Sequence, residues 1–426
     1  MLKTVRSACW CIFVLGLASA AEFKFAFCPG ETRLEYSFVT PQTLYDAKRG
    51  YGYLRIDAGA PDKPSVFAVD VDEGNYDVTI KFGDPARATS TTIKTESRRL
   101  MVEKVDAAPA QYETRTFTVN VRKPAISSGG VTKLNSRELG PPVAPDWDEH
   151  LSFEFNGAHP GVVSIEIKPA PGAVTLFIAG DSTVTDQPQE PYAGWGQMLP
   201  RFFKQGVAVS NHAESGLALA SFEGQKRLEK VLSMMKSGDY LFIQFGHNDQ
   251  KDKRPNAGAF TTYTADLNRY IEAVRKKNGI PVLVTPMERR RFDANGKPTP
   301  TLADYAQAVK QVGAAAHVPV IDLNAMSLIL YTALGPENST KAFVFYPANT
   351  FPGKSEALKD NTHHNAYGGY ELARCIVEGI RGQVPELAKH LAQDAGTFDP
   401  IKPDPPENFT LPASPINDKV EKPAGN

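Results

Sequence analysis

Four polar residues in the second half of the chain have the types and spacing needed for acyl transfer. Ser182 follows the apolar run VTLFIAG at 174–180, Asn248 lies in GHND at 246–249, and Asp360 and His363 stand three positions apart in DNTHHN. A serine hydroxyl becomes a nucleophile when a base removes its proton, and histidine suits that role near neutral pH. A carboxylate on the other ring nitrogen fixes the tautomer and stabilises the imidazolium. The set predicts Ser182 as nucleophile, His363 as base and Asp360 as the residue that orients the base.

The oxyanion formed during acyl transfer needs N–H donors that are already in place. Ser182 lies between a predicted strand end and a predicted helix start, so its own backbone N–H can serve. Gly216 permits close backbone approach and a second N–H, and the side-chain amide of Asn248 can supply a third. We therefore predict an oxyanion hole made of Ser182, Gly216 and Asn248.

Each of these motifs, taken alone, can also be explained as ordinary local structure without a catalytic role. GDS is commonly a turn between a strand and a loop, GHND can be an ordinary turn, and Asp-x-x-His is frequent. All of them occur here in order, each at the end of a predicted strand or helix. In open parallel sheets, sites collect at the carboxyl ends of the strands, so the ordered set favours one active site.

Several neighbouring side chains are candidates for contact with substrate. The spacing of three from Asp360 selects His363 as the base and leaves His364 as a neighbour of the substrate. Arg289 and Arg290, in ERRRF, can hold carboxylates because guanidinium binds them in a bidentate manner, or they can belong to a solvated loop. Trp195, in YAGWG, can stack on a sugar or pack beside the nucleophile loop.

The elements that must position these residues fall into two patterns. After the linker PAPGA at 169–173, apolar runs at 174–180, 207–211, 240–246, 280–286 and 318–323 alternate with helix-like segments. Those segments cover 224–236, 264–277, 301–317 and 367–381. Strands buried on both faces and spaced by amphipathic helices predict a parallel sheet in an α/β fold. In residues 21–170, apolar and polar residues instead alternate in short runs that are separated by turn residues. This pattern predicts an antiparallel β-sandwich.

The N-terminus reads as a secretory signal peptide over residues 1–20. Lys3 and Arg6 precede an apolar core at 8–17 and the small-x-small site Ala18-Ser19-Ala20. The core is too short to span ~30 Å as a helix, so export to the periplasm or the medium is expected and a membrane anchor is not. Of the cysteines outside this segment, Cys28 and Cys375, we expect buried thiols, with a bridge as the alternative.

Length and composition set further bounds. A chain of 426 residues favours two domains, and a net charge of -1 gives no reason to expect nucleic acid as a partner. The predicted parts are a sandwich at 21–170, a catalytic domain at 171–395 and a Pro-rich tail at 396–426 that does not join the core. The sequence contains no HExxH, CxxC or GxGxxG motif, so neither a catalytic metal nor a nucleotide cofactor is predicted.

Over 174–381 the chain resembles the SGNH (GDSL-type) hydrolase superfamily, and within it the rhamnogalacturonan acetylesterases. The matching pieces include FIAGDSTV, NHAESGLALASF, FIQFGHNDQ and DNTHHNAYGGYELA. The family's serine, glycine, asparagine and Asp-x-x-His blocks correspond to Ser182, Gly216, Asn248 and the pair Asp360 and His363. Leu217-Ala218 replaces an Arg-Ser that often follows the glycine, which affects expected substrate contacts in that loop. The β-rich part resembles, more loosely, a galactose-binding-like sandwich.

The resemblance implies a flavodoxin-like three-layer α/β/α catalytic domain and a serine esterase that removes acetyl groups from pectin, with rhamnogalacturonan as the first candidate. Acetyl-xylan, another acetylated glycan or an acyl lipid is the alternative substrate. A third possibility is a carbohydrate-binding protein that has lost activity, although intact catalytic positions argue against it. The expected partner is thus an acetylated polysaccharide or oligosaccharide.

Overall fold

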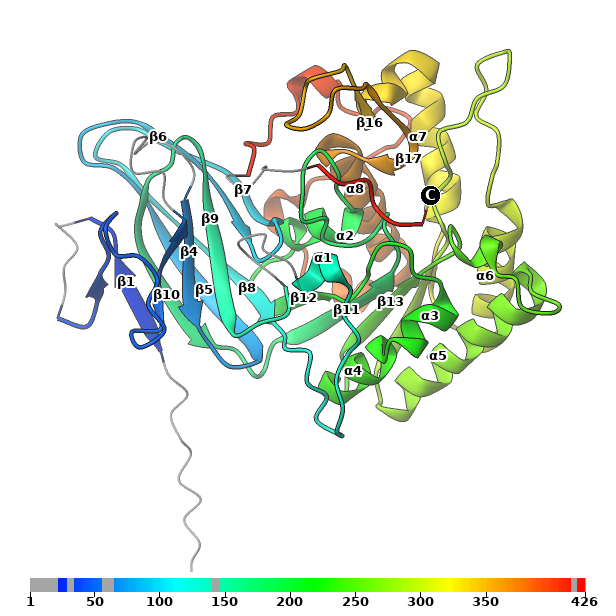
Figure 1. Cartoon of the computed structure of the whole chain (residues 1–426), viewed down its shortest axis with the longest axis horizontal. Coiled ribbons are helices and arrows are strands. Elements are labelled where there is room, and N and C mark those ends of the chain that lie inside the picture. The colour runs from blue at the N-terminus through cyan, green and yellow to red at the C-terminus, as the bar shows by residue number, and fades with distance from the viewer. Residues whose placement is uncertain (1–21, 29–33, 56–64, 140–145, 415–419, 426) are drawn as a thin grey trace, which may run out of the picture.

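The computed structural model describes residues 22–28, 34–55, 65–139, 146–414 and 420–425. The predicted signal peptide at 1–20 lies outside these ranges. Figure 1 shows the described chain as two parts side by side, with antiparallel strands in one and a helix-covered sheet in the other.

The helix-covered part is built on a five-stranded sheet in the order β12-β11-β13-β14-β15. Every neighbouring pair in it is parallel. This order is that of flavodoxin-like folds. The strands are β11 (Val174–Gly180), β12 (Val207–Asn211), β13 (Tyr240–Gln244), β14 (Ile280–Val284) and β15 (Val320–Ile321). The predicted α/β fold with a parallel sheet is confirmed.

Alternate residues of β11 bury against opposite helical layers. Leu176 and Ile178 belong to the same apolar cluster as Ile376 of α8. Phe177 and Ala179 belong to another, which includes Leu267 of α5. Successive side chains of a strand point to opposite faces, so the apolar run VTLFIAG supplies both faces of a sheet between two helix layers.

The helices largely follow the predicted segments. Residues 224–236 instead contain the last residue of one short helix and the whole of a second, separated by a left-handed Lys226, and α7 was not predicted. The helices are α1 (Ser136–Leu139), α2 (Trp195–Met198), α3 (Leu219–Gly224), α4 (Arg227–Met234), α5 (Thr264–Lys276), α6 (Ala303–Ala316), α7 (Leu323–Asn338), α8 (Ala366–Gln383) and α9 (Pro385–Ala388).

The other part consists of two five-stranded sheets, ordered β2-β1-β10-β5-β8 and β3-β4-β9-β6-β7. All pairs are antiparallel except β1 with β2. The strands are β1 (Phe23–Ala26), β2 (Ser37–Phe38), β3 (Tyr51–Arg55), β4 (Ser65–Asp70), β5 (Gly74–Gly83), β6 (Thr89–Thr95), β7 (Arg99–Ala107), β8 (Tyr112–Val121), β9 (His150–His159) and β10 (Val162–Pro169). Phe25 of one sheet packs edge-on against Phe67 of the other, with ring centroids 5.0 Å apart. The sheets thus share an apolar core, while the galactose-binding-like assignment stays a prediction.

A short hairpin carries the predicted acid and base. Strand β16 (Phe343–Tyr346) pairs antiparallel with β17 (Leu358–His364), and β17 contains both Asp360 and His363. The side chain of Asn365 then accepts a hydrogen bond from the Gly368 N–H at 3.1 Å and caps α8. Asp360 and His363 are therefore held on a strand, where the sequence predicted only a loop before a helix.

The described Pro-rich residues pack against both parts of the protein instead of leaving the core as a tail. Lys94 of β6 donates to the Pro412 carbonyl at 2.8 Å, and the Ser414 hydroxyl donates to Glu154 of β9 at 2.6 Å. The Val420 side chain is 1% exposed. These buried contacts explain why a Pro-rich composition does not loosen this stretch.

Two further expectations concern thiols and membranes. In the described chain no disulfide joins Cys28 and Cys375, and Cys375 is buried, whereas Cys28 is only partly buried. Within the described ranges, no helix combines the length and the apolar character needed to cross a membrane.

Candidate active site

Ser182, His363 and Asp360 form a continuous hydrogen-bonded chain. The Ser182 hydroxyl lies 2.8 Å from His363 Nε2, and His363 Nδ1 lies 2.8 Å from Asp360 Oδ2. All three side chains are buried. A proton on Nδ1 donates to the carboxylate and leaves Nε2 as the acceptor for the serine hydroxyl. This geometry is the one that activates a serine nucleophile.

Asp360 is kept ionised by its surroundings. Burial alone would raise its pKa, but the hydrogen bond and charge of His363 and the N–H donors of Thr362 and His363 outweigh burial and lower the pKa to about 2. Those backbone donors reach Oδ1 at 2.8 and 3.1 Å, so Oδ2 is left to face the imidazole. The carboxylate is thus fixed in both charge and direction.

The loop that carries Ser182 is a tight turn built around Asp181. The Asp181 carboxylate accepts from the Thr183 N–H at 2.9 Å, and its carbonyl accepts from the N–H groups of Val184 and Thr185. A Cβ atom at Gly180 would lie 2.7 Å from the Val184 side chain. The glycine of AGDST is therefore required for the turn to close.

Donors suited to an oxyanion converge beside Ser182. Among the described residues, the backbone N–H groups of Ser182 and Gly216 donate to no protein acceptor. Gly216 has φ +83°, a left-handed conformation that favours glycine. Asn248 Nδ2 donates to the Leu217 carbonyl at 3.1 Å, which leaves its second hydrogen available. The structure brings these three predicted residues together at one end of the sheet.

Asp249 links the two loops that carry Asn248 and Gly216. One carboxylate oxygen accepts from the Leu219 N–H at 3.0 Å and the other from the Gly246 N–H at 2.9 Å. Burial raises its pKa to about 7, against the effect of these N–H donors. The sequence placed Asp249 in the GHND motif but gave no sign of this linking role.

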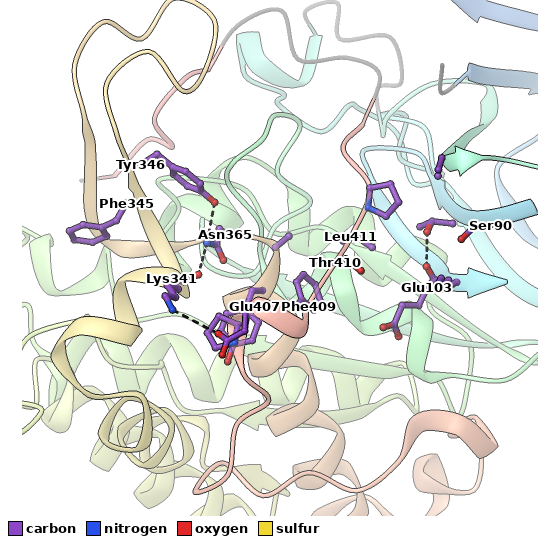
Figure 2. A pocket seen from close by; sticks show the side chains of 18 residues that line it. Ser90, Glu103, Lys341, Phe345, Tyr346, Asn365, Glu407, Phe409, Thr410 and Leu411 are labelled. Carbon is purple, nitrogen blue, oxygen red and sulfur yellow. Dashed lines mark hydrogen bonds and ion pairs between the residues drawn. The ribbon is translucent and has the colours of Figure 1, made fainter. Parts of the chain in front are cut away.

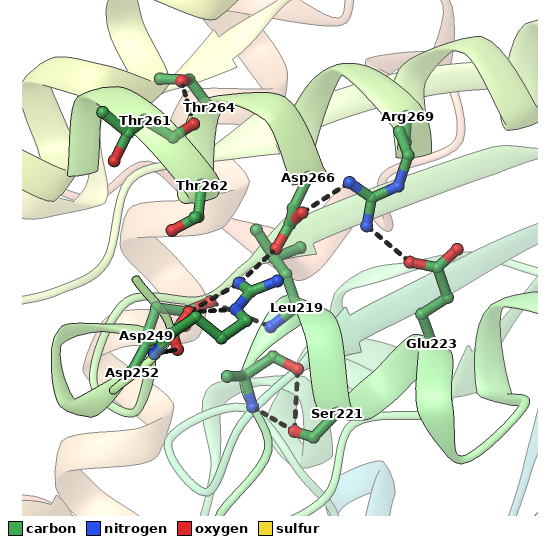
Figure 3. A network of polar contacts seen from close by, with 12 residues as sticks. Leu219, Ser221, Glu223, Asp249, Asp252, Thr261, Thr262, Thr264, Asp266 and Arg269 are labelled. Carbon is green, nitrogen blue, oxygen red and sulfur yellow. Dashed lines mark hydrogen bonds and ion pairs between the residues drawn. The ribbon is translucent and has the colours of Figure 1, made fainter. Parts of the chain in front are cut away.

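Ion pairs lie close to Asp249. Figure 3 shows Asp266 of α5 bound to Arg269, whose guanidinium also reaches Glu223 of α3. Arg254 bridges Asp252 and Asp266. The loop after β13 is thereby tied to α5, and α5 to α3.

Two candidates for substrate contact, Trp195 and His364, are buried beneath the site. Trp195 is fully buried, and its Nε1 donates to Gln244 Oε1 at 2.7 Å. The His364 ring lies beside Phe343, and its Nε2 lies 2.9 Å from the Tyr331 hydroxyl. Neither ring can stack on or touch a bound sugar. This corrects the expectation for His364, whereas for Trp195 it supports the packing alternative. Tyr192 instead packs edge-on against His363, with ring centroids 5.8 Å apart.

The two candidate arginines differ in their surroundings. Arg290 donates hydrogen bonds to Ser339 Oγ at 2.9 Å and Asn361 Oδ1 at 3.0 Å, and its guanidinium lies 4.9 Å from the Phe345 ring centre. Arg289 donates one weaker bond, 3.3 Å, to the His247 carbonyl. Burial lowers its pKa, while the charges of Asp181, Glu288 and Asp360 oppose that change. Of the two arginines, Arg289 is thus the one influenced by the charge of the catalytic Asp360.

The antiparallel sheets also contact the nucleophile loop, by which we mean residues 181–192. Arg98 donates to the carbonyls of Gln187 and Tyr192 at 2.9 and 3.1 Å, and Arg99 pairs with Asp186 at 2.6 Å. All of these acceptors lie within ten residues after Ser182. No local motif marks Arg98 or Arg99, so sequence reasoning did not identify them.

A cavity of about 720 Å³ lies at the seam between the two parts. Figure 2 shows Tyr346 and Asn365 on one side and Ser90 and Glu103 on the other. Neither Ser182 nor His363 lines it. The cavity is separate from the catalytic residues, although Asn365 directly follows strand β17.

Comparisons with known proteins identify the family of this chain. Residues 178–368 match the GDSL-like Lipase/Acylhydrolase family. Rhamnogalacturonan acetylesterase RhgT of Bacillus subtilis strain 168 is 41% identical over 225 residues, which cover 52% of this chain and 96% of that protein. The probable rhamnogalacturonan acetylesterase YesY of the same strain is 34% identical, over 48% of this chain and 92% of that protein. The uncharacterized esterase YxiM, also from that strain, is 25% identical over 85% of this chain and 91% of that protein.

The chain therefore belongs to the GDSL-like lipase/acylhydrolase family, and the resemblance predicted from its motifs is confirmed. Within that family it is an esterase, with named rhamnogalacturonan acetylesterases among its relatives.

Proposed function

We propose that this esterase removes O-acetyl groups from a carbohydrate, with acetylated rhamnogalacturonan as the first candidate. The observation that carries the proposal is the hydrogen-bonded chain from Ser182 through His363 to Asp360. The named activities of RhgT and YesY support the choice of acetyl group and polymer.

The first half of the reaction forms an acetyl-enzyme. Ser182 Oγ bonds to the acetyl carbonyl carbon while His363 Nε2 takes the hydroxyl proton. The N–H groups of Ser182 and Gly216 and the free hydrogen of Asn248 hold the oxyanion. The carbon–oxygen bond to the sugar then breaks, and His363 gives its proton to the departing sugar oxygen.

The second half releases acetate. Water attacks the acetyl carbon as His363 takes one of its protons, and the bond to Ser182 Oγ breaks as the serine regains a proton from His363. Asp360 stays ionised throughout and stabilises the imidazolium. The proton transfers use Ser182 and His363, which already lie within hydrogen-bonding distance, and Asp360 is likewise bonded to His363.

An acidic polymer suits the charge around the site better than a neutral one. Lys251 Nζ lies 3.4 Å from Asn248 Oδ1, and Arg289 stands behind the same loop. Both cations can attract the carboxylates of galacturonate residues in rhamnogalacturonan. Acetyl-xylan, which lacks these carboxylates in its backbone, is the alternative that the charge does not favour.

The direct test is acetate release from a panel of acetylated polysaccharides by the purified protein. We expect release from rhamnogalacturonan to exceed release from acetylated xylan, and Ser182→Ala to abolish both. Ser233→Ala, on α4 away from the site, serves as the matched control. Normal turnover by Ser182→Ala would refute the assignment of the nucleophile, and a preference for xylan would refute the proposed substrate.

A serine-reactive aryl phosphonate separates an active esterase from a binding protein that has lost activity. The serine oxygen bonds to phosphorus, the aryl oxide leaves, and His363 takes the serine proton. Labelling at Ser182 supports catalysis, and its absence in the folded wild type supports the binding-protein alternative. Export stays a proposal of the same kind, tested by the N-terminal sequence of protein recovered from the periplasm or medium.

A further inference from the structure

Residues 420–425, which we call the strap, lie across the catalytic residues. Val420 is buried in a small apolar cluster with Tyr192 and Val344, and Tyr192 itself packs on His363. The Glu421 N–H donates to Gln189 Oε1 at 3.0 Å. The strap is therefore anchored on the nucleophile loop and on the hairpin that carries the base.

The far end of the strap lies against the oxyanion donors. A Cβ atom added to Gly425 would lie 2.5 Å from Asn248 Oδ1 and 3.0 Å from the Gly216 Cα. A Cβ added to Gly216 would lie 3.2 Å from the Ala424 Cβ. Ala424 and Gly425 thus contact two of the three groups assigned to the oxyanion. A substrate carbonyl directed at the same donors has to share or take that space.

Beyond Val420 and Glu421, the strap is held by a weak ion pair. Lys422 Nζ lies 3.9 Å from Asp360 Oδ2, and the lysine side chain is 53% exposed. An ion pair so long and so exposed contributes little to stability. Burial lowers the pKa of Lys251, and the nearby positive charges of Arg289 and Lys422 lower it further. Like charges at this end therefore oppose the seating of the strap.

We propose that the strap covers the oxyanion hole in the resting enzyme and that an incoming ester displaces it. Val420 and Glu421 anchor the strap, while Lys422 pairs only weakly with the catalytic carboxylate. A glycan that bears carboxylates offers Lys422 another partner and so displaces the strap more readily than a neutral glycan. The inference rests on the proposed function of Ser182 and adds a gate to that site.

Two variants of the full chain test the gate. Deletion of residues 420–426 removes the strap and leaves the packed stretch at 411–414 intact. Gly425→Ala keeps the length but adds a Cβ where Asn248 and Gly216 leave no room, so the end of the strap must move. Gly396→Ala is the matched control, because Gly396 also has positive φ and a Cβ there meets no atom within 4 Å.

The measurement is the second-order rate constant for labelling of Ser182 by a small uncharged aryl phosphonate. We expect about a tenfold increase in both strap variants if the strap covers the site about 90% of the time, because reactivity scales with the open fraction. Gly396→Ala should label like the wild type. Equal rates in the wild type, the deletion and Gly425→Ala would overturn the gate while leaving the proposed nucleophile intact. If none of the folded forms is labelled at Ser182, the proposed function fails and the gate fails with it.

A synthetic peptide of sequence VEKPAGN, added to the deletion variant, supplies a second readout. The gate would be supported if the peptide inhibits aryl-acetate hydrolysis competitively. It would be supported further if a peptide with Gln in place of Lys422 inhibits more weakly. Unchanged hydrolysis at millimolar peptide would contradict it, because a segment that occupies the site when attached must also bind when free at sufficient concentration.

Discussion

Arg99 of the antiparallel sheets and Asp186 of the nucleophile loop form a buried ion pair with a distance of 2.6 Å between Nε and Oδ2. Asp186 lies four residues after Ser182 and also accepts from Asn211 Nδ2 at 2.8 Å. Arg99 in turn pairs with Asp146 at 2.7 Å. The position of the nucleophile therefore depends on a strand from the other half of the protein.

Arg99→Met should lower both stability and turnover. It leaves the Asp186 carboxylate buried without its cation, a loss that typically costs about 3–5 kcal/mol. Urea unfolding and aryl-acetate hydrolysis would measure the two effects. Arg115→Met, at an exposed position of β8, is the control. Wild-type stability in Arg99→Met would show that the pair does not support the loop.

The adjacent histidines should respond differently to replacement. His363→Ala removes the base and should reduce kcat by roughly 10³-fold or more. His364→Phe loses one hydrogen bond to Tyr331 but keeps an aromatic ring in its apolar site, so it should lower the melting temperature and spare most of kcat. A loss of kcat in His364→Phe equal to that in His363→Ala would contradict the assignment of the base.

Asn248→Ala should lower kcat by roughly 10²–10³-fold, because oxyanion donors in comparable sites contribute that much. The KM for aryl acetate should change far less, since the lost bond strengthens only as charge develops on the carbonyl oxygen. Asn268→Ala, on the exposed face of α5, is the control. A change confined to KM would place Asn248 in substrate binding instead.

Comparison with Asp249→Asn should show that the buried carboxyl makes the free energy of unfolding depend on pH. The pKa of an unfolded aspartate is about 3.9, and burial raises that of Asp249 to about 7. Between these values the native state holds a proton that the unfolded state has lost, so the stability of the wild type falls as pH rises. Relative to Asp249→Asn, its free energy of unfolding should decrease by at most roughly 1.4 kcal/mol per pH unit between pH 4 and 7.

Urea titrations of wild type and Asp249→Asn at several pH values in that window provide the measurement. The variant should also lose turnover at every pH, because one amide hydrogen would face a backbone N–H where a carboxylate oxygen now accepts. Parallel stability curves would show that Asp249 titrates as an ordinary exposed carboxyl.

Arg289 and Arg290 form a matched pair for testing charge preference. Arg289→Gln should raise KM for an acetylated oligogalacturonide more than for a neutral aryl acetate. Arg290→Gln should affect both substrates alike, because that guanidinium is engaged by Ser339, Asn361 and Phe345. An equal effect of Arg289→Gln on charged and neutral substrates would remove the support for an acidic polymer.

The parallel sheet could be predicted from the sequence because its strands are apolar on both faces and end in polar motifs. The same pattern placed Ser182 and Asn248 at the carboxyl ends of β11 and β13. Helix α7 escaped prediction because its apolar residues form no clear stripe and a non-helical Gly335 and Pro336 interrupt it. Strand β17 was not predicted because its polar residues lack the alternation that is typical of a strand with one buried face.

The contacts between the two halves could not be predicted from the sequence at all. Arg98 and Arg99 meet residues more than eighty positions away, and nothing local distinguishes them from surface arginines. The burial of Trp195 is a similar case, since its partner Gln244 lies on another strand. Local pattern identifies residue types suited to chemistry, while long-range packing decides which of them reach the substrate.

The position of the strap has a practical consequence for recombinant work. Any peptide joined beyond Gly425 would begin beside Asn248 and Gly216, whereas β1 lies at the opposite end of the molecule in Figure 1. An affinity tag on the carboxyl end would therefore either crowd the catalytic serine or pull the strap away from it. The choice of tagged end becomes an experimental variable, and rates from the two kinds of fusion should not be pooled.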